Sequence, residues 1–237
     1  LILVLYPTVI APLFNKFDST QLYERFKTLT GFGPLQERDS DGNTAVDRIY
    51  PLYDRQMQPI TVGLRYRVSQ EAKYTDQYDV IGGLPAKAMT SARITKAVKA
   101  ANIFNNATDS SYTGGDGVTL SNTAHPTNGF ATYSNQETAA AFSYSTLKTM
   151  RQNMRKVRDA RNQTMRNAGP AYLIVPPDLQ FEAESFMNST LLPDTNWNNA
   201  NMVKNGLTLL VMDNLSSTTQ FALVNTEKEK HTLSFVQ

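Results

Sequence analysis

One segment of the chain gathers residue types that could do chemistry. Residues 114–126 read GGDGVTLSNTAHP and include His125, one of only two histidines. A hydrolase needs a base such as His125, an acid such as Asp116 to orient it, and a hydroxyl nucleophile such as Ser121 or Thr123. The segment does not match the nucleophile elbow G-x-S-x-G, and the proline after His125 favours extended backbone at the histidine. We therefore expect His125 to fasten a loop through hydrogen bonds, with a hydrolase built around His125 as an alternative.

The glycines of the same segment raise a second kind of chemistry, phosphate binding. A P-loop would end in G-K-[ST], and a dinucleotide fingerprint would space its glycines differently, so the segment matches neither motif. Gly114, Gly115 and Gly117 are instead predicted to supply the positive φ angles of tight turns.

The composition leaves little room for thiol or metal chemistry. The chain has no cysteine, which excludes disulfides, thiol catalysis and thiolate metal sites. Two histidines are too few for a multi-histidine metal site within one chain. The acidic run DSDGN at 39–43 places its glycine too early for an EF-hand loop and predicts a turn. We expect no catalytic residue, no metal and no cofactor, and hence no enzyme.

Length and charge narrow the class of protein further. The 237 residues suffice for one large domain or two small ones, and 41% hydrophobic with 19% charged residues fits neither disorder nor a membrane protein. A net charge of +2 argues against a dedicated nucleic-acid binder. The apolar start LILVLYPTVIAPLF is interrupted by Pro7 and Pro12 and is too short to span a membrane. It predicts an extended arm, buried or covered by a partner, or else an ordinary first strand.

The first third of the chain is predicted to hold a helix and a long hairpin. Residues 18–28 (DSTQLYERFKT) combine capping residues with helical spacing of apolar residues. From Ile60 to Val68 apolar and polar residues strictly alternate, which predicts a strand with one apolar face, and residues 44–52 form a weaker strand upstream. Because a two-stranded hairpin is marginal alone in water, we expect this one to lie on another surface.

The rest of the chain mixes helices and strands without an alternating βαβ pattern. A short helix is predicted over 69–78 and an alanine-rich helix over 86–105, with Pro85 in its first turn. That longer helix carries a basic stripe of Arg93, Lys96 and Lys99. Residues 172–175 are continuously apolar, as in a strand buried on both faces, and Pro176-Pro177 opens a further helix. LTLLVM and QFALVN are predicted to be two more strands, so the fold class is α+β.

A basic helix is predicted over residues 145–166. One of its faces is apolar and carries Leu147, Met150, Met154 and Val157. The other is basic and includes Arg151, Arg155 and Arg158. Binding of these cations to DNA, in a DNA-associated protein, is one interpretation. Because no aromatic residues stand among the arginines to stack on bases, we favour contact with acidic groups of another copy of the chain.

Three segments, taken together, resemble the major capsid (head) proteins of tailed bacteriophages. They are QPITVGLRYRVSQEAKYTDQY (58–78), AANIFNNATDSSYTGGDGVTLSNTAHP (100–126) and AYLIVPPDLQFEAESFMNST (171–190). The resemblance covers roughly residues 45–236 and is to the branch with Mu-type head subunits, which implies an α+β fold of the Hong Kong 97-like kind. Some relatives cross-link through a lysine of the extended loop, but residues 33–70 contain no lysine, so that chemistry is not expected here.

The resemblance also implies an organisation of the chain into parts. Residues 1–32 would be an N-terminal arm, and 33–68 an extended β-hairpin loop that reaches over a neighbouring subunit. Residues 69–133 would be a peripheral domain with a long spine helix and a connecting loop, and 134–222 an axial domain. Residues 223–237 would return to the peripheral domain, which then looks incomplete. In this organisation GGDGVTLSNTAHP joins two domains.

The implied function is structural. The chain would self-assemble through pentamers and hexamers into the icosahedral head shell, which encloses double-stranded phage DNA bound non-specifically on its inner face. It would reside in the virion after assembly in the host cytoplasm, with scaffolding, portal or decoration proteins as further partners and no membrane. The residues we expect between subunits come from the hairpin and the basic helix: Ile60, Val62, Leu64, Arg65, Tyr66, Arg67, Arg151, Arg155 and Arg158.

Overall fold

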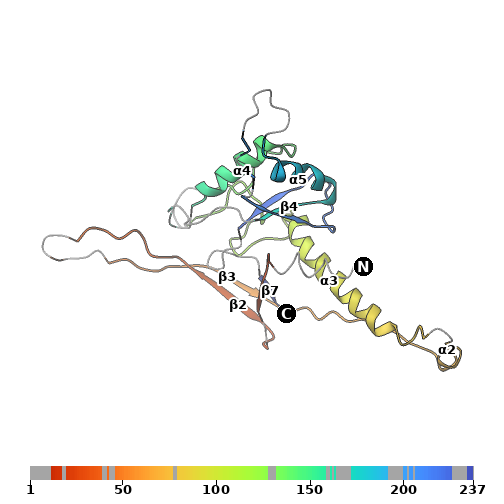
Figure 1. The fold of residues 1–237 in the computed structure, drawn as a ribbon. Helices are drawn as coiled ribbons and strands as arrows, with labels where there is room; N and C mark the ends of the chain where they lie inside the picture. Colours follow the sequence, from red (N-terminus) through yellow and green to blue (C-terminus); the bar gives the residue numbers. More distant parts are fainter. Residues whose placement is uncertain are drawn as a thin grey trace.

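A small three-stranded sheet lies at the centre of the molecule. The structure, a computed structural model, describes residues 12–17, 20–38, 42, 46–76, 79–127, 132–158, 161, 163, 172–191, 200–201, 203–204, 206–225 and 234–236. Strand β4 (Tyr172–Val175) is flanked by β5 (Thr208–Val211), which runs parallel to it, and by β6 (Ala222–Val224), which runs antiparallel. Figure 1 shows helices on both sides of this sheet.

The side chains of β4 alternate between two hydrophobic clusters. Ile174 packs with Ala100, Ala101 and Phe104 of helix α3 (Leu84–Asn105) on one face of the sheet. Leu173 and Val175 pack on the other face, together with α4 (Tyr144–Lys156) and α5 (Gln180–Asn188). All three β4 side chains are buried, so the predicted central strand, covered on both faces, is confirmed.

Helix α3 is longer than the surface that it covers. Its buried residues, Ala97, Ala100, Ala101 and Phe104, all belong to its C-terminal half. Alanine lets this half approach the sheet closely, and Pro85 occupies the first turn as predicted. The N-terminal half continues away from the sheet toward a short helix, α2 (Gln70–Tyr74), which is capped by Ser69 (Figure 1).

Helices α4 and α5 cover the opposite face of the sheet. Ser143 caps α4 by accepting a hydrogen bond from the Thr146 amide, and Leu147 is fully buried. The helix ends at Lys156, ten residues before the predicted end at 166, and most residues from 159 to 171 lie outside the described part of the chain. After β4, a 3-10 turn, η2 (Pro177–Leu179), leads into α5, as the Pro-Pro pair predicts.

The prediction of a helix over residues 18–28 is wrong. Residues 24–29 form a strand, β2 (Glu24–Leu29), paired antiparallel with β3 (Pro51–Met57). Arg25 and Asp54 form an ion pair across these strands, at 2.5 Å. The helical spacing does not mark a core face, because Leu22 and Leu29 are both exposed. Pairing with a distant segment therefore outweighs the local pattern.

The predicted strand from Ile60 to Val68 is also absent. Residues 58–69 follow β3 as a chain without helix or strand, and all five apolar side chains of the alternating pattern are exposed. The extended hairpin instead uses β2 and β3, so one of its strands lies before residue 33. A strand requires a neighbouring strand for its backbone groups, and residues 60–68 have none within the described part of the chain.

Two further segments complete the fold. Near the termini, β1 (Asn15–Phe17) pairs in parallel with β7 (Ser234–Val236). Where the structure describes residues 106–143, these form no regular helix or strand and are tied together by isolated bridges such as His125 to Tyr133. No described helix is both long enough and apolar enough to cross a membrane.

The close packing of α3 can be tested by substitution. Ala101 is fully buried between α3 and the sheet, so Ala101→Leu should overpack the core and lower the free energy of unfolding by about 1–3 kcal/mol. Ala86→Leu, on the exposed part of the same helix, is the matched control and should change it little. Urea unfolding followed by circular dichroism measures both, and equal effects would contradict the packing described here.

Candidate functional site

His125 is held by a buried polar contact. Its Nδ1 lies 2.7 Å from Asp116 Oδ2, and its ring stacks on Tyr133 with centroids 5.1 Å apart. The residue is only 6% exposed, and its other ring nitrogen, Nε2, has no hydrogen-bond partner among the described residues. An acid and a base are thus present, and among the described residues no hydroxyl is hydrogen-bonded to the base. The contact ties two parts of the loop together, as a loop-fastening role of His125 requires.

The glycines around Asp116 serve different purposes. Gly117 has φ +80°, the left-handed conformation predicted for it. Gly114 and Gly115 do not have positive φ, so that prediction is wrong for both. Gly115 is needed for close approach instead, because an added Cβ would lie 3.3 Å from Tyr53 Cβ.

The loop that contains His125 fastens the hairpin to the body. Tyr53 of β3 donates a hydrogen bond from its hydroxyl to the Pro126 carbonyl at 2.8 Å, and Arg55 donates to the Thr113 carbonyl. Burial, and then the charge of Asp116, raises the pKa of Tyr53. Between these two contacts, the Ser121 amide of the loop donates a hydrogen bond to the carbonyl of Ala107, just beyond α3. The segment is therefore a structural joint between β3 and the end of α3.

A second joint holds the base of the extended loop, residues 30–50. Both terminal nitrogens of Arg161 donate to the Asp47 carboxylate at 2.6 Å, and Nη1 also donates to the Gly31 carbonyl. The Gly33 amide donates to the same carboxylate, and Arg161 lies 5.9 Å from the centre of the Tyr50 ring. Hydrogen bonds from Arg161 and then Gly33 hold the pKa of Asp47 well below its ordinary value. Sequence analysis missed this pair, whose members are 114 residues apart.

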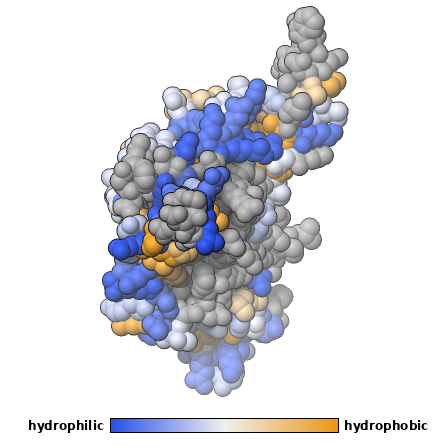
Figure 2. All heavy atoms as spheres, turned by 90° about the vertical axis from the view of Figure 1, so that its left-hand side faces the viewer, coloured by the Kyte–Doolittle hydropathy of each residue, from blue (hydrophilic) through white to orange (hydrophobic). Residues whose placement is uncertain are grey.

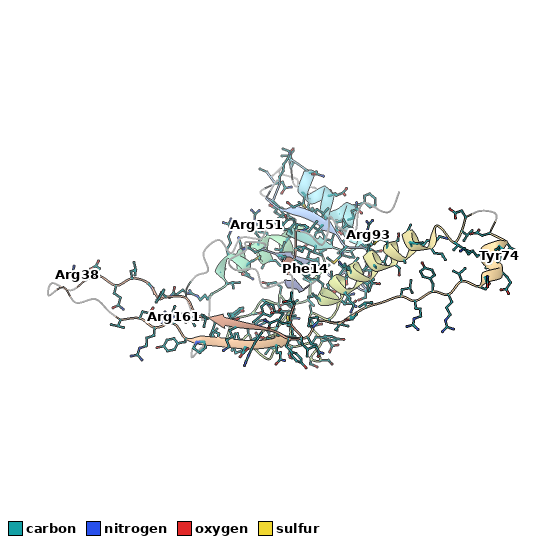
Figure 3. The ribbon with its side chains drawn as sticks, turned by 90° about the horizontal axis from the view of Figure 1, so that it is seen from below. Phe14, Arg38, Tyr74, Arg93, Arg151 and Arg161 are labelled. Carbon is teal, nitrogen blue, oxygen red and sulfur yellow. The ribbon has the colours of Figure 1, made fainter. Side chains whose placement is uncertain are left out.

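Exposed apolar side chains lie in the two segments that extend from the body of the subunit. Leu35 and Val46 of the extended loop are 99% and 88% exposed. Ile60 and Leu64, in the segment leading to α2, are 76% and 68% exposed. These two segments, the extended loop and the segment that leads to α2, are called the two excursions below. Figures 1 and 3 show them leaving the body in opposite directions, with Arg38 toward the end of the first and Tyr74 in the second.

The structure brings the sequence-predicted candidates into two separate groups. Six lie in the exposed segment before α2: Ile60, Val62, Leu64, Arg65, Tyr66 and Arg67. Arg151 and Arg155 belong to α4, and Arg158 follows the end of that helix. Arg151 is half-buried with its guanidinium against Gly206, whereas Arg155 is exposed. Figure 2 views the molecule from the side on which the extended loop projects. The coloured residues on this side are mainly hydrophilic, with smaller apolar areas.

The family model and the solved structures that match this chain both belong to phage capsid proteins. The model of a family described as phage capsid protein matches residues 53–236. No curated protein matches the chain. Among solved structures, the bacteriophage JBD30 capsid is similar, with a TM-score of 0.71 and 13% identity over 88% of this chain and 91% of that chain.

Two other structures of the same phage are also similar. The JBD30 capsid decorated with minor capsid protein trimers gives a TM-score of 0.61 at 14% identity, over 86% of this chain and 90% of that one. The JBD30 procapsid gives 0.58 at 15%, over 89% and 92%. The chain has an α+β capsid fold and belongs to the phage capsid protein family. It is a structural, shell-forming subunit of a phage capsid.

The joint at His125 makes a stability prediction. His125→Ala removes the partner of a largely buried carboxylate and should lower the free energy of unfolding by about 1–3 kcal/mol. Asp109→Asn, an exposed change near the same loop, is the control and should have little effect. Thermal unfolding measures both. A hydrolytic activity that disappears with His125→Ala would overturn the structural role.

The joint at Asp47 makes a prediction about pH. Because the pKa of Asp47 is lowered by folding, the pair stabilises the fold above the ordinary aspartate pKa of about 3.9 and loses this contribution as pH falls below it. In an NMR titration of carboxyl carbons, Asp47 should therefore stay ionised through pH 4. Arg161→Gln should restore a more ordinary titration, and Arg38→Gln, on the same loop, should not. An Asp47 that titrates normally in the unmodified protein would show that the pair does not persist in solution.

Proposed function

We propose that copies of this chain associate head to tail into the pentamers and hexamers of an icosahedral phage head. The extended loop of one copy lies on two parts of the next copy. These are the segment before α2 and the N-terminal half of α3, called its outer half below. Two different surfaces at opposite ends of a subunit make a heterologous contact, which closes into a ring when the rotation between neighbours permits. The opposite directions of the two excursions in Figure 3 support this arrangement.

The observation that carries the proposal is the apolar surface left uncovered. Leu35 and Val46 of the extended loop are 99% and 88% exposed, and Ile60 and Leu64 before α2 are 76% and 68% exposed. Apolar side chains gathered in this way on a surface mark a site of contact with another protein. Each exposed leucine or valine that becomes buried contributes about 1.5–3 kcal/mol to association.

The Hong Kong 97-like organisation is part of the proposal. Residues 1–32 act as an arm, apart from β2, which forms the hairpin stem with β3. The region 33–68 comprises most of the extended loop, β3 and the segment before α2. Residues 69–133 form the peripheral domain with α3 as its spine helix, 134–222 form the axial domain, and 223–237 return to the peripheral domain. The subunit works without catalysis or a cofactor. It resides in the virion after assembly in the host cytoplasm.

The partners of the shell follow from the same role. Packaged double-stranded DNA lies against the inner face and is bound without sequence preference. The similar JBD30 capsid is decorated by minor capsid protein trimers, which supports a decoration protein as a partner here. Scaffolding and portal proteins are further proposed partners.

The extended loop tests the proposal most sharply. Leu35→Asp with Val46→Asp should leave a folded subunit that no longer assembles, because two charges would have to be buried against the next copy. Gln36→Asp adds charge to the same loop without removing an apolar group, and we expect it to assemble. Electron microscopy reads out assembly, and circular dichroism verifies folding. Normal shells from the double variant would refute the proposed contact.

Variants of the basic face of α4 distinguish contact with another subunit from contact with DNA. Arg151→Glu with Arg155→Glu should reduce shell yield more than the DNA content of the shells that do form, because we place these cations beside acidic groups of another copy. Sucrose-gradient yield and DNA per particle are the two measurements. Shells that assemble normally but hold little DNA would instead favour the DNA-associated interpretation of this helix.

A further inference from the structure

Helix α3 carries a cationic stripe that the contact between subunits does not use. The helix contains Lys87, Arg93, Lys96 and Lys99 and no acidic residue. All four side chains are exposed. Within the part of the chain that the structure describes, none of them forms an ion pair or a side-chain hydrogen bond. A helix with cations and no anions leaves its charge to be neutralised from outside the subunit.

Three of these cations lie on the side of α3 that is opposite the apolar side formed by Ile94 and Val98. Ile94 and Val98 are four residues apart and share one face. Lys96 is two residues from each, about 200° around the helix, and therefore points the other way. Figure 3 likewise shows Arg93 on the side of α3 away from the segment that leads to Tyr74. If the apolar side and that segment meet the next copy, the stripe of Arg93, Lys96 and Lys99 stays free.

The chemistry of the stripe fits a DNA backbone. Its three cations recur every third residue over about 9 Å of helix axis, and duplex DNA carries a negative charge per about 1.7 Å. The side chains beside the stripe include Met89, one turn before Arg93, and Thr95, one turn before Lys99. Such a surface neutralises phosphates without reading sequence.

We propose that Arg93, Lys96 and Lys99 of α3 form the surface through which the subunit contacts packaged double-stranded DNA. This inference rests on the proposed shell, since it assigns the stripe to the inner side. It assigns the cations of α4 to a different partner, another copy of the chain. The two basic helices of the subunit therefore have separate roles.

One pair of single variants tests the assignment on the same helix. Lys96→Gln and Lys87→Gln each remove one exposed charge, but Lys87 is about half a turn around the helix from Lys96. Binding of purified subunits to a short random-sequence duplex is measured over a range of salt concentrations. Lys96→Gln should lower the slope of log affinity against log salt by about 0.9, and Lys87→Gln should leave it unchanged. Equal effects of the two variants would overturn the proposal.

Filled particles provide the second test. Ultraviolet cross-linking of DNA-filled wild-type shells, followed by mass spectrometry, should place nucleotide adducts on α3 peptides. The triple variant Arg93→Gln, Lys96→Gln, Lys99→Gln should still form shells and should lose those adducts. Adducts confined to other helices would overturn the assignment. Folded triple-variant subunits that do not assemble would also overturn it, because the stripe would then meet another copy. If wild-type subunits formed no shells, the proposed function would fail, but the duplex comparison would still decide whether the stripe binds DNA.

Discussion

The organisation of this subunit depends on one constraint, which is that its two long excursions cannot be covered by the chain that forms them. The sheet and its helices bury a core around β4, but Leu35 and Val46 on one side and Ile60 and Leu64 on the other remain in contact with water. Apolar side chains in such numbers are favourable only when another surface covers them. In the proposed shell a second copy of the chain supplies that surface, so that folding and assembly share one driving force.

Polar contacts hold the parts of the subunit that must point in fixed directions. Arg161 fixes the base of the extended loop through Asp47, and Tyr53 fixes the hairpin stem through Pro126. Hydrogen bonds depend on direction, whereas apolar contact does not. The subunit thus uses polar joints to orient its excursions and leaves apolar surface to be covered by its neighbours. The buried contact of Asp116 with His125 orients its loop in the same way.

Sequence patterns predicted the parts of this fold whose partners are local or fill a core. The continuous apolar run at 172–175 marked β4 because such a run is stable only when covered on both faces. Pro85 marked the start of α3 because a proline in the first turn acts on the backbone within a few residues. The spacing within residues 18–28 misled because β3, some thirty residues away, decides the conformation of β2. The alternation from Ile60 to Val68 predicts an apolar face, but a strand also requires a backbone partner, and the described residues of one subunit do not provide it. The pairing of Asp47 with Arg161 leaves no local trace, because its members meet only after the chain folds.

A cryo-EM reconstruction of particles assembled from the full-length protein tests the central claim most directly. The account predicts a closed shell in which Leu35 and Val46 of one copy lie against residues 60–68 and the outer half of α3 of the next. A shell in which both sets of side chains face solvent would contradict it. So would a protein that stays monomeric with both surfaces exposed at concentrations where similar capsid proteins assemble.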